Sequence, residues 1–389
     1  MHIGIDATAL YGRYGGVEYA LWNLLDALKT VDRANFYTVY IPADGPPPER
    51  LKSFNRRWRW HRLSFCGGDK ARRVWWQQVI LPRQVKRDHC HLLHAPTYIA
   101  PLACPIPLVL TIYDFIALSH PDFATPLNRV HYGALLPRSA ARASRVIVPS
   151  EAVRDELTRR VPSAANRARV VPLGVEPLFH QTPDARTCEN LRAQLRLPSR
   201  YLLFVGNPEP KKNLAMLQRA RELLPREPLF DLPLVVTGGA RAWADYEIAT
   251  QSTLHRTTQS TLSTTNAEAQ TRTISVGYVR RADLPALYAM CEAFIFPSLI
   301  EGFGLPVLEA LACGAPVVTT DRVPLPNLFE AALQCDPLDP KSIATTIERV
   351  LRDDNLRADL RRRARDYARS FTWRRSAQMT LDVYQSLVR

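Results

Sequence analysis

The sequence predicts an α/β protein made of two Rossmann-like domains, and three features of the chain support this. Its 389 residues exceed what a single ordinary core usually contains. Apolar runs of strand length alternate with longer amphipathic segments, which is the pattern of repeated β-α units. The strand-like runs show little polar alternation, as expected for a parallel sheet with helices on both faces.

The first half of the chain contains one such series of elements. We expect strands at 2–6, 36–41, 108–113, 145–149 and 169–173, with helices at 16–29, 72–81, 126–143 and 150–160. Ser150 stands where the N-cap of the last helix belongs. Residues 174–197 contain turn formers and little periodicity, so we expect a connector there.

The second half repeats the pattern and then ends in helices. We expect strands at 201–206, 232–238, 273–277, 293–297 and 316–320, followed by helices at 354–370 and 373–388. Residues 249–272 are rich in Thr, Ser and Gln, and this composition favours a surface loop between two strands.

Composition and the start of the chain indicate a cytoplasmic globular protein. Hydrophobic residues make up 46% of the chain and charged residues 23%, which excludes disordered and fibrous classes. The first residues lack the basic start and apolar run of a secretory signal. Seven cysteines, an odd number without paired spacing, indicate reduced thiols.

The net charge of +14 is unevenly distributed. Residues 51–87 hold eleven Lys and Arg against one acid, Asp69, and they include Trp58, Trp60, Trp75 and Trp76. Residues 70–87 could form an amphipathic helix that docks on anionic lipid. Alternatively, the tryptophans belong to the core and the arginines form a solvated face. We favour peripheral association with the inner face of the cell membrane.

The strongest functional signal lies in residues 296–318. A strand is followed by Glu301, by the turn Gly302-Phe303-Gly304 and by a helix that ends at Gly314. A glycine-rich turn at a helix N-terminus presents unpaired N–H groups and the positive end of the helix dipole, so it suits an anion. Glu309 lies about one turn inside the helix. The two carboxylates can therefore face different parts of one ligand, such as a sugar and a ribose diol.

The segment EGFGLPVLE resembles the signature of retaining glycosyltransferases of family 4, which have the GT-B fold. The resemblance implies two Rossmann-like domains facing across a cleft, with a C-terminal helix crossing back to the N-terminal domain. It implies an acceptor domain at 1–178, a donor domain at 179–370 and the crossover helix at 371–389. Glu301, Gly302, Phe303, Gly304 and Leu305 would then contact the donor sugar, and Glu309 the ribose hydroxyls.

Two further segments resemble the same family. In 201–220, Lys212 matches the lysine that grips the donor diphosphate, Lys211 stands where Arg is frequent, and Gly206 precedes them. Asn207 replaces a second diphosphate-binding Arg of many members. The resemblance makes Glu301 and Lys212 the catalytic residues, and it places Tyr278 and Val279, in 276–298, beside the nucleotide base.

The N-terminal half offers weaker matches. Gly15 and Gly16 resemble the family's glycine turn before the first helix, and they can also be a plain turn. Tyr113 and Asp114 lie in a segment that often reads T-x-H-D, so Tyr113 replaces the family's histidine. A sugar contact and a buried structural tyrosine with a capping aspartate are both compatible with this segment.

Metal and cofactor sites are not expected. His89, Cys90, His91 and His94 are dense, but no second ligand pair follows at a usual zinc spacing. The chain also lacks the Asp-x-Asp pair with which other glycosyltransferases hold a divalent ion. The resemblance therefore implies a reaction that needs no metal.

The resemblance implies a retaining hexosyltransferase of bacterial polysaccharide biosynthesis. GDP-mannose is the leading donor, because the start of the chain and VGNPEPKKNL resemble the mannosyltransferase-like branch, and the acceptor is a saccharide or a lipid-linked saccharide. A UDP-sugar donor, a sugar-nucleotide epimerase and a phosphorylase remain alternatives. A basic protein that binds nucleic acid is the non-enzymatic alternative, although no RNA-binding aromatic motif is present.

Overall fold

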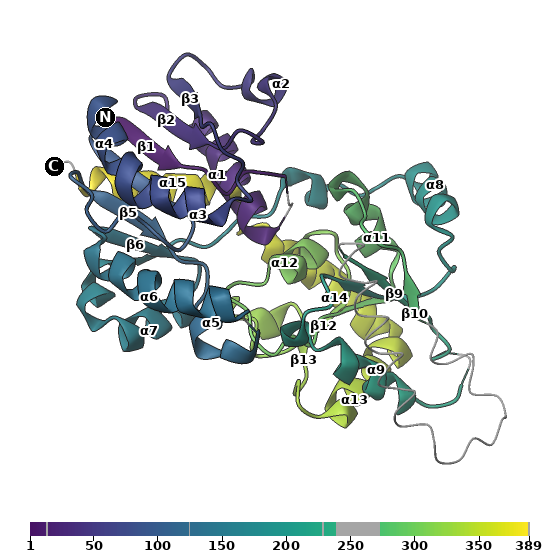
Figure 1. Ribbon diagram of the computed structural model, residues 1–389. Coiled ribbons are helices and arrows are strands. Elements are labelled where there is room, and N and C mark those ends of the chain that lie inside the picture. The colour runs from purple at the N-terminus through teal and green to yellow at the C-terminus, as the bar shows by residue number, and fades with distance from the viewer. Residues whose placement is uncertain (13–14, 124, 228, 239–272, 388–389) are drawn as a thin grey trace. The chain divides into compact units, whose positions relative to one another are not determined.

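A computed structural model describes residues 1–12, 15–123, 125–227, 229–238 and 273–387. The chain forms two compact units, one of Met1–Gly174 with Phe371–Arg389 and one of Val175–Ser370 (Figure 1). The division after Gly174 falls four residues before the boundary drawn from the sequence at 178. The loop expected at 249–272 lies outside the described residues.

The first unit is built on a seven-stranded parallel sheet within the described residues. Its order is β3-β2-β1-β4-β5-β6-β7. Ile3 pairs with Tyr37 of β2 on one side and with Leu92 of β4 on the other. The direction of strand progression therefore reverses at β1, and such a reversal opens a crevice at the carboxyl ends of the strands. The strands are β1 His2–Asp6, β2 Phe36–Ile41, β3 Trp58–Arg62, β4 Leu92–Ala95, β5 Leu108–Thr111, β6 Arg145–Val148 and β7 Ala168–Val170.

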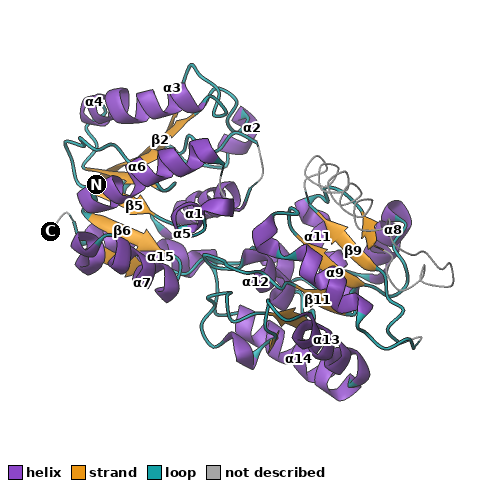
Figure 2. Cartoon of the chain, turned by 60° about the horizontal axis from the view of Figure 1, so that its bottom comes forward, coloured by secondary structure: helices purple, strands orange, loops and turns teal. Residues whose placement is uncertain are grey.

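Helices cover both faces of this sheet (Figure 2). The helix expected at 72–81 is the middle of a longer run, because α3, a π-helix and α4 follow one another without a break. Ser150 caps α7 by accepting a hydrogen bond from the Val153 N–H at 3.3 Å. The bounds are α1 Gly16–Val31, α2 Pro48–Leu51, α3 Lys70–Trp75, η1 Trp76–Ile80, α4 Leu81–Arg87, α5 Ile116–Ser119, η2 Pro121–Phe123, α6 Pro126–Arg142, α7 Glu151–Arg160, η3 Pro162–Arg167 and α15 Trp373–Gln385.

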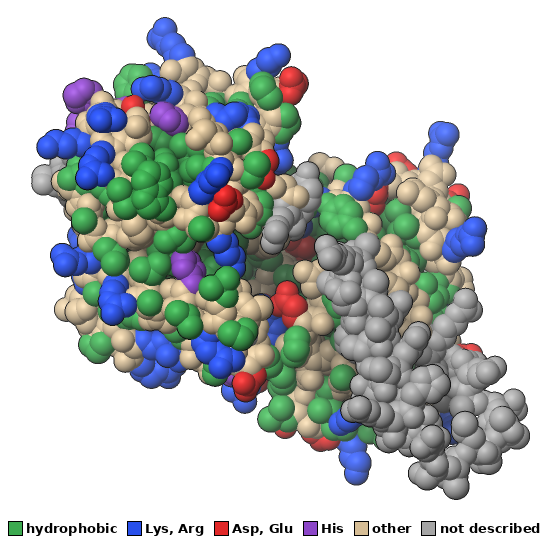
Figure 3. Space-filling model, viewed as in Figure 1, with side chains coloured by type: hydrophobic (Ala, Val, Ile, Leu, Met, Phe, Trp, Pro, Cys, Tyr) green, Lys and Arg blue, Asp and Glu red, His purple; other side chains and the backbone are tan. Residues whose placement is uncertain are grey.

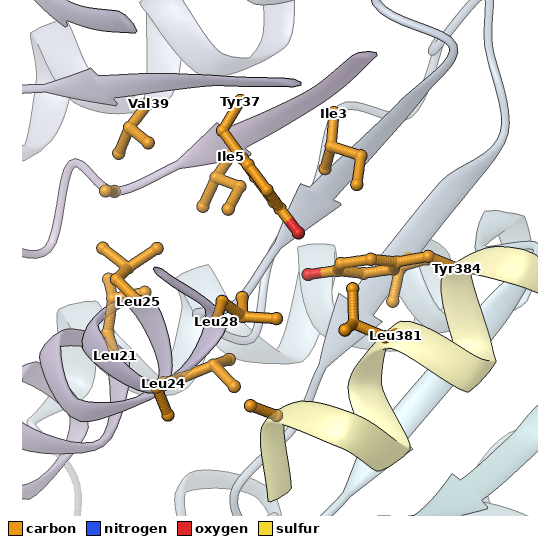
Figure 4. Close-up of a cluster of buried hydrophobic side chains, with 14 of the residues drawn as sticks. Ile3, Ile5, Leu21, Leu24, Leu25, Leu28, Tyr37, Val39, Leu381 and Tyr384 are labelled. Atoms are coloured by element: carbon orange, nitrogen blue, oxygen red, sulfur yellow. The ribbon is translucent and has the colours of Figure 1, made fainter. Parts of the chain in front are cut away.

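The last helix, α15, is part of the first unit's core. Leucines of α1, apolar side chains of β1 and β2, and Leu381 of α15 share one cluster, and the hydroxyls of Tyr37 and Tyr384 point toward one another (Figure 4). His94, which is fully buried on β4, bonds the Tyr384 hydroxyl at 2.7 Å and the Thr111 hydroxyl at 2.8 Å. Burial lowers the pKa of His94 to about 3, so the ring is neutral at physiological pH.

The second unit contains a six-stranded parallel sheet in its described part, in the order β10-β9-β8-β11-β12-β13. Leu202 of β8 pairs with Leu234 of β9 and with Ala293 of β11, so progression reverses between β8 and β11. The strands are β8 Leu202–Val205, β9 Leu234–Thr237, β10 Thr273–Ser275, β11 Ala293–Ile295, β12 Val317–Thr319 and β13 Leu333–Gln334.

Helices also flank the strands of this second sheet (Figure 2). They are η4 Pro177–His180, α8 Ala185–Leu195, η5 Pro210–Lys212, α9 Leu214–Glu222, η6 Arg281–Asp283, α11 Leu284–Met290, α12 Leu305–Ala312, η7 Leu328–Glu330, α13 Pro340–Arg352 and α14 Asp354–Ala368. The two parallel sheets confirm the predicted architecture of two Rossmann-like domains.

One local prediction was wrong, and some elements were not predicted. Residues 174–197 are not only a connector, because α8 occupies Ala185–Leu195 and the Asp184 carboxylate caps it by accepting from the Thr187 N–H at 2.7 Å. A strand also forms at Trp58–Arg62, where an arginine-rich sequence hid the pattern. This strand is at the sheet edge, so it needs only one paired neighbour.

All seven cysteines lie within the described residues and are free. None of the described helices has the length and apolar character needed to cross a membrane.

Candidate active site

Most of the sequence-predicted donor residues gather where β8 and β11 end. Gly206 to Asn213 follow β8, and residues 296–304 follow β11. The two strands are neighbours at the reversal of the second sheet, so their following loops lie together. In open α/β sheets this is the position where ligands bind.

Lys212 and Glu301 meet at this point. The Lys212 Nζ donates to Glu301 Oε1 at 2.6 Å, and the two side chains are only 13% and 10% exposed. The Lys212 ammonium also lies 4.7 Å from the centre of the Phe296 ring. A cation and a carboxylate that are 89 positions apart in the chain therefore form one partly buried pair.

Two residues that the sequence reasoning missed hold this pair in place. The Ser298 hydroxyl donates to Glu301 Oε1 at 2.6 Å. The Asn213 amide donates to the carbonyls of Pro297 at 3.1 Å and Pro337 at 2.7 Å, which ties the loop after β8 to the loop after β11. Asn213 has a φ of +61°, a conformation that asparagine tolerates, but no sequence signal predicts its long-range partners.

The turn before α12 has the predicted form. Gly304 has a φ of +103°, and a Cβ there would lie 2.4 Å from Cγ1 of Val323, so glycine is required. Phe303 is buried, and Pro306 occupies the first turn of α12. The N–H groups at the start of α12 and the helix dipole make this turn suited to an electron-rich ligand.

Glu309 lies inside α12 and is buried. Its Oε1 accepts from the Arg281 guanidinium at 2.6 Å, and its Oε2 accepts from the Tyr288 hydroxyl at 3.3 Å. Arg281 also pairs with Glu176. Burial raises the pKa of Glu309 against the opposing pull of Arg281. Burial alone would lower the pKa of Arg281, but Glu309 and Glu176 raise it, so Arg281 stays charged.

Arg281 and Glu176 form an ion pair that the sequence did not predict. The motif around Tyr278 was expected to border the base, but it gave no reason to join Arg281 to a glutamate 105 positions earlier. The arginine is shared between two carboxylates, so Glu309 has a cationic partner before any ligand binds.

The remaining donor candidates differ in exposure. Lys211 pairs with Glu209 at 3.2 Å rather than with Glu301, and its carbonyl accepts from the Ser298 hydroxyl at 3.0 Å. Tyr278 is 51% exposed, whereas Val279 is buried. Gly206 and Asn207 lie directly after β8, and Leu305 begins α12. Lys212 is therefore the lysine that faces Glu301, the carboxylate that the sequence predicts to bind the donor sugar.

The candidate residues of the first unit lie in two places: Gly15 and Gly16 at the start of α1, and Tyr113 and Asp114 just after β5. Gly15 precedes α1 and Gly16 begins it, and a Cβ on either would meet nothing within 4 Å. Tyr113 is buried, and its ring packs edge-on against Tyr98 with a centroid distance of 5.7 Å. Asp114 accepts from the Tyr98 hydroxyl at 2.8 Å and from the Ile116 N–H at 3.0 Å.

Two histidines of the cluster near residue 90 make hydrogen bonds within the first unit. Among the described residues, no group of three or more His, Cys, Asp or Glu side chains is arranged to hold a metal ion. His94 instead docks α15, and the His91 ring accepts from the His2 N–H at 2.8 Å.

Two parallel-sheet units, with a Lys–Glu pair at the sheet reversal of the second, define the class of glycosyltransferases with the GT-B fold. Two sequence families match: "Glycosyltransferase Family 4" over residues 14–177 and "Glycosyl transferases group 1" over residues 189–367. The O-antigen chain mannosyltransferase B of Escherichia coli is 30% identical over 299 residues, which cover 76% of this chain and 74% of that protein. The chain belongs to glycosyltransferase family 4, and it is a glycosyltransferase.

Other relatives carry different names. The serotype-specific mannosyltransferase WbdA of Escherichia coli is 28% identical over 64% of this chain but only 29% of its own length. The D-inositol 3-phosphate glycosyltransferase of Salinispora arenicola is 33% identical over 64% of this chain and 56% of that protein.

Solved structures agree with the fold. Anabaena HepE in complex with UDP-glucose has a TM-score of 0.74 and 19% identity, with both chains fully covered. WaaG, a glycosyltransferase involved in lipopolysaccharide biosynthesis, has a TM-score of 0.71 and 15% identity over 98% of this chain and 99% of that one.

Proposed function

We propose that the chain transfers a hexose, with retention of configuration, from a nucleoside diphosphate sugar to a saccharide or lipid-linked saccharide in bacterial polysaccharide synthesis. The partly buried Lys212–Glu301 pair at the sheet reversal is the observation that carries this proposal. Glu309, on the helix that follows Glu301, supplies a second carboxylate for the ribose hydroxyls.

In the proposed reaction, the acceptor hydroxyl oxygen bonds to the anomeric carbon on the face from which the diphosphate leaves. The bond between the anomeric carbon and the diphosphate oxygen breaks, and the diphosphate takes the electron pair. The hydroxyl proton passes to the departing diphosphate. Lys212 leaves Glu301 to stabilise the charge that grows on the diphosphate, and Glu301 accepts hydrogen bonds from the sugar hydroxyls. Because Lys212 supplies this positive charge, the proposal needs no metal or other cofactor.

GDP-mannose is the proposed donor. Two of the relatives are named mannosyltransferases, and the O-antigen enzyme is matched over most of its length. The same relative's name supports a polysaccharide product. A UDP-sugar is the second candidate, because the HepE structure was solved with UDP-glucose.

Nucleotide-dependent thermal stabilisation tests the donor. The protein is heated with GDP, UDP, ADP and their sugar conjugates in the presence of EDTA. We expect the largest shift with GDP and GDP-mannose, because at equal concentration the ligand that binds the folded state most tightly stabilises it most. A larger shift with UDP than with GDP would show that the donor carries uracil rather than guanine. The absence of any shift would contradict the proposed donor site.

We also propose peripheral binding to an anionic membrane on the cytoplasmic side. Trp75 is 58% exposed at the end of α3, and Val79, one turn later, is 38% exposed. Lys and Arg side chains are spread over the displayed face of the first unit, among hydrophobic ones (Figure 3). Trp58 and Trp76 are buried instead, so these two tryptophans belong to the core.

Vesicle sedimentation tests this membrane proposal. We expect co-sedimentation with vesicles of phosphatidylglycerol but not with vesicles of phosphatidylcholine, and weaker binding for Trp75→Ser. Equal sedimentation of Trp75→Ser and wild type would show that Trp75 does not contribute to membrane binding.

A further inference from the structure

Both oxygens of the Glu309 carboxylate already accept a hydrogen bond from the protein. Arg281 Nη2 donates to Oε1 at 2.6 Å, and the Tyr288 hydroxyl donates to Oε2 at 3.3 Å. An ionised carboxylate has about four lone-pair sites, so each oxygen can still accept another bond. How strongly a further donor binds there depends on how much of the negative charge of Glu309 is cancelled by Arg281.

Arg281 does not belong to Glu309 alone. Its Nε donates to Oε1 of Glu176 while its Nη2 holds Glu309, so one guanidinium is shared between two carboxylates. The side chains of Arg281 and Glu176 are 19% and 16% exposed, so little water separates them from each other. Two negative charges and one positive charge leave a net charge of −1 on these three residues, which we call the charge network.

Local sequence fixes the position of Glu176. It is the second residue of the second unit, and Pro177 follows it. Proline disfavours the helical conformation in the residue before it, and Glu176 is extended, with φ −69° and ψ 144°. Phe179 of η4 is fully buried, and the centre of its ring lies 4.8 Å from the guanidinium carbon of Arg281. The chain around η4 therefore gives Arg281 both a carboxylate and an aromatic face.

The charge of Glu176 limits how far Arg281 neutralises Glu309. Burial raises the pKa of Glu309, Arg281 lowers it and Glu176 raises it further, so the charges of the network act on one another. A hydrogen bond to an ionised acceptor is roughly twice as strong as one between neutral groups. Without the charge of Glu176, Arg281 and Glu309 would form a neutral pair. A hydroxyl group would then donate to a weaker acceptor.

We propose that Glu176 is a positioning residue for nucleotide recognition, which keeps Arg281 from pairing fully with Glu309 and so strengthens Glu309 as the acceptor for the ribose hydroxyls. Glu176 acts through Arg281 and needs no contact of its own with the nucleotide. The inference rests on the proposed function in one respect, because that function makes Glu309 the carboxylate that binds ribose. The charge network makes the site prefer nucleotides that carry both ribose hydroxyls.

Calorimetric titration of the full chain tests the proposal. GDP and 2′,3′-dideoxy-GDP, which lacks both ribose hydroxyls, are titrated into wild type, Glu176→Gln, Glu176→Asp and Glu292→Gln. UDP and its dideoxy analogue are titrated in parallel. Glu292 is the matched control, because it pairs with Arg200 in the same unit and its side chain is 20% exposed. Thermal unfolding of each variant identifies any loss of folding.

The measured quantity is the ratio of the two affinities, ribonucleotide over dideoxy analogue. We expect a ratio of roughly ten to a hundred for the preferred base in wild type, since hydrogen bonds to charged groups are the strong ones. Glu176→Gln should lower this ratio about three- to tenfold by weakening the ribonucleotide, with little change for the dideoxy analogue. Glu292→Gln should keep the ratio of wild type.

Glu176→Asp provides a second test that does not depend on the folding of Glu176→Gln. It keeps the charge but shortens the side chain by one methylene group, so its hold on Arg281 should weaken. The ratio of Glu176→Asp should therefore lie between those of wild type and Glu176→Gln. A ratio equal to that of wild type in both variants would overturn the proposal.

A purely structural role for Glu176 would give a different result. If Glu176 only fastened the start of the second unit to η6, its replacement would weaken both nucleotides alike and leave the ratio unchanged, which would overturn the proposal. A ratio near one in wild type would also overturn it, because Glu309 would then not bind the ribose hydroxyls. If wild type bound neither GDP nor UDP, the proposed donor site would fail as well. A ribonucleotide preference that Glu176→Gln retains in full would contradict only the role of Glu176.

Discussion

The ammonium of Lys212 lies 2.6 Å from Oε1 of Glu301, and the Ser298 hydroxyl reaches the same oxygen at 2.6 Å. The lysine and the glutamate follow two different strands, β8 and β11, and both are largely shielded from water. This pairing places a cation and a carboxylate together at the reversal of the sheet, where each compensates the charge of the other.

The first prediction concerns Lys212. Lys212→Ala should lower the rate at which nucleoside diphosphate is released from the donor sugar by about 10²- to 10³-fold, because it removes a charge that stabilises the leaving group. Slow hydrolysis of the donor measures this without an acceptor. Lys211→Ala is the control, since Lys211 pairs with the half-exposed Glu209, and it should have a much smaller effect. Similar losses in both variants would contradict the assignment of Lys212.

The second prediction concerns Glu309. Glu309→Gln should weaken nucleotide binding by roughly ten- to a hundredfold, because a hydrogen bond to a charged group contributes about 1.5–3 kcal/mol. Arg281 retains Glu176 as a partner, so the unit should stay folded. Fluorescence titration with the preferred nucleotide measures the change. Glu292→Gln, which alters a partly exposed pair with Arg200, should bind like wild type.

The third prediction concerns Asp32, the buried C-cap of α1. Its carboxylate accepts from the Ala34 N–H at 2.9 Å, the Asn35 N–H at 3.1 Å and the Tyr37 hydroxyl at 2.5 Å. Burial alone would raise the pKa of Asp32, but these hydrogen bonds hold it below its usual 3.8. A lowered pKa stabilises the folded state above the unfolded-state value, and this contribution is lost as the pH falls through the folded-state value.

Asp32→Asn should therefore lower the free energy of unfolding at pH 7 by about 1.5–3 kcal/mol. The difference from wild type should shrink below about pH 4, where the unfolded carboxyl of wild type becomes protonated. Urea unfolding at a series of pH values measures both effects. Asp26→Asn, which changes an exposed partner of Lys29, should neither lower the free energy of unfolding nor change its pH dependence. A pH-independent difference for Asp32→Asn would contradict a stabilising role for the charge on Asp32.

The fourth prediction concerns the docking of α15. Tyr384→Phe removes the partner of the buried His94 Nδ1, so it should destabilise the first unit by about 1–3 kcal/mol. Hydrogen exchange should quicken in α15 and α1 but not in the second unit. Tyr367→Phe makes the same chemical change in the second unit, where the hydroxyl donates to the Pro326 carbonyl. This variant should quicken hydrogen exchange in the second unit but not in α15 and α1.

The sequence predicted those parts that depend on local pattern. The period of apolar residues located most strands. The glycine turn before α12 was predicted with its correct form, because its residues are contiguous in the chain. Residue pairs formed across the fold, such as Arg281 with Glu176, have no local signal, since only the folded unit brings them together. The helix α8 was missed because Leu191 is its only buried residue, so its sequence shows no apolar stripe.

The position of α15 has a consequence for how the protein is made. The second unit is complete once residue 370 has been synthesised, but the first unit needs Phe371–Arg389 as well. Translation runs from the N-terminus, so the segment Met1–Gly174, which emerges first from the ribosome, cannot close its core until Phe371–Arg389 has been made after the whole second unit. A chain released after Ser370 should therefore contain a complete second unit and a first unit that lacks part of its core.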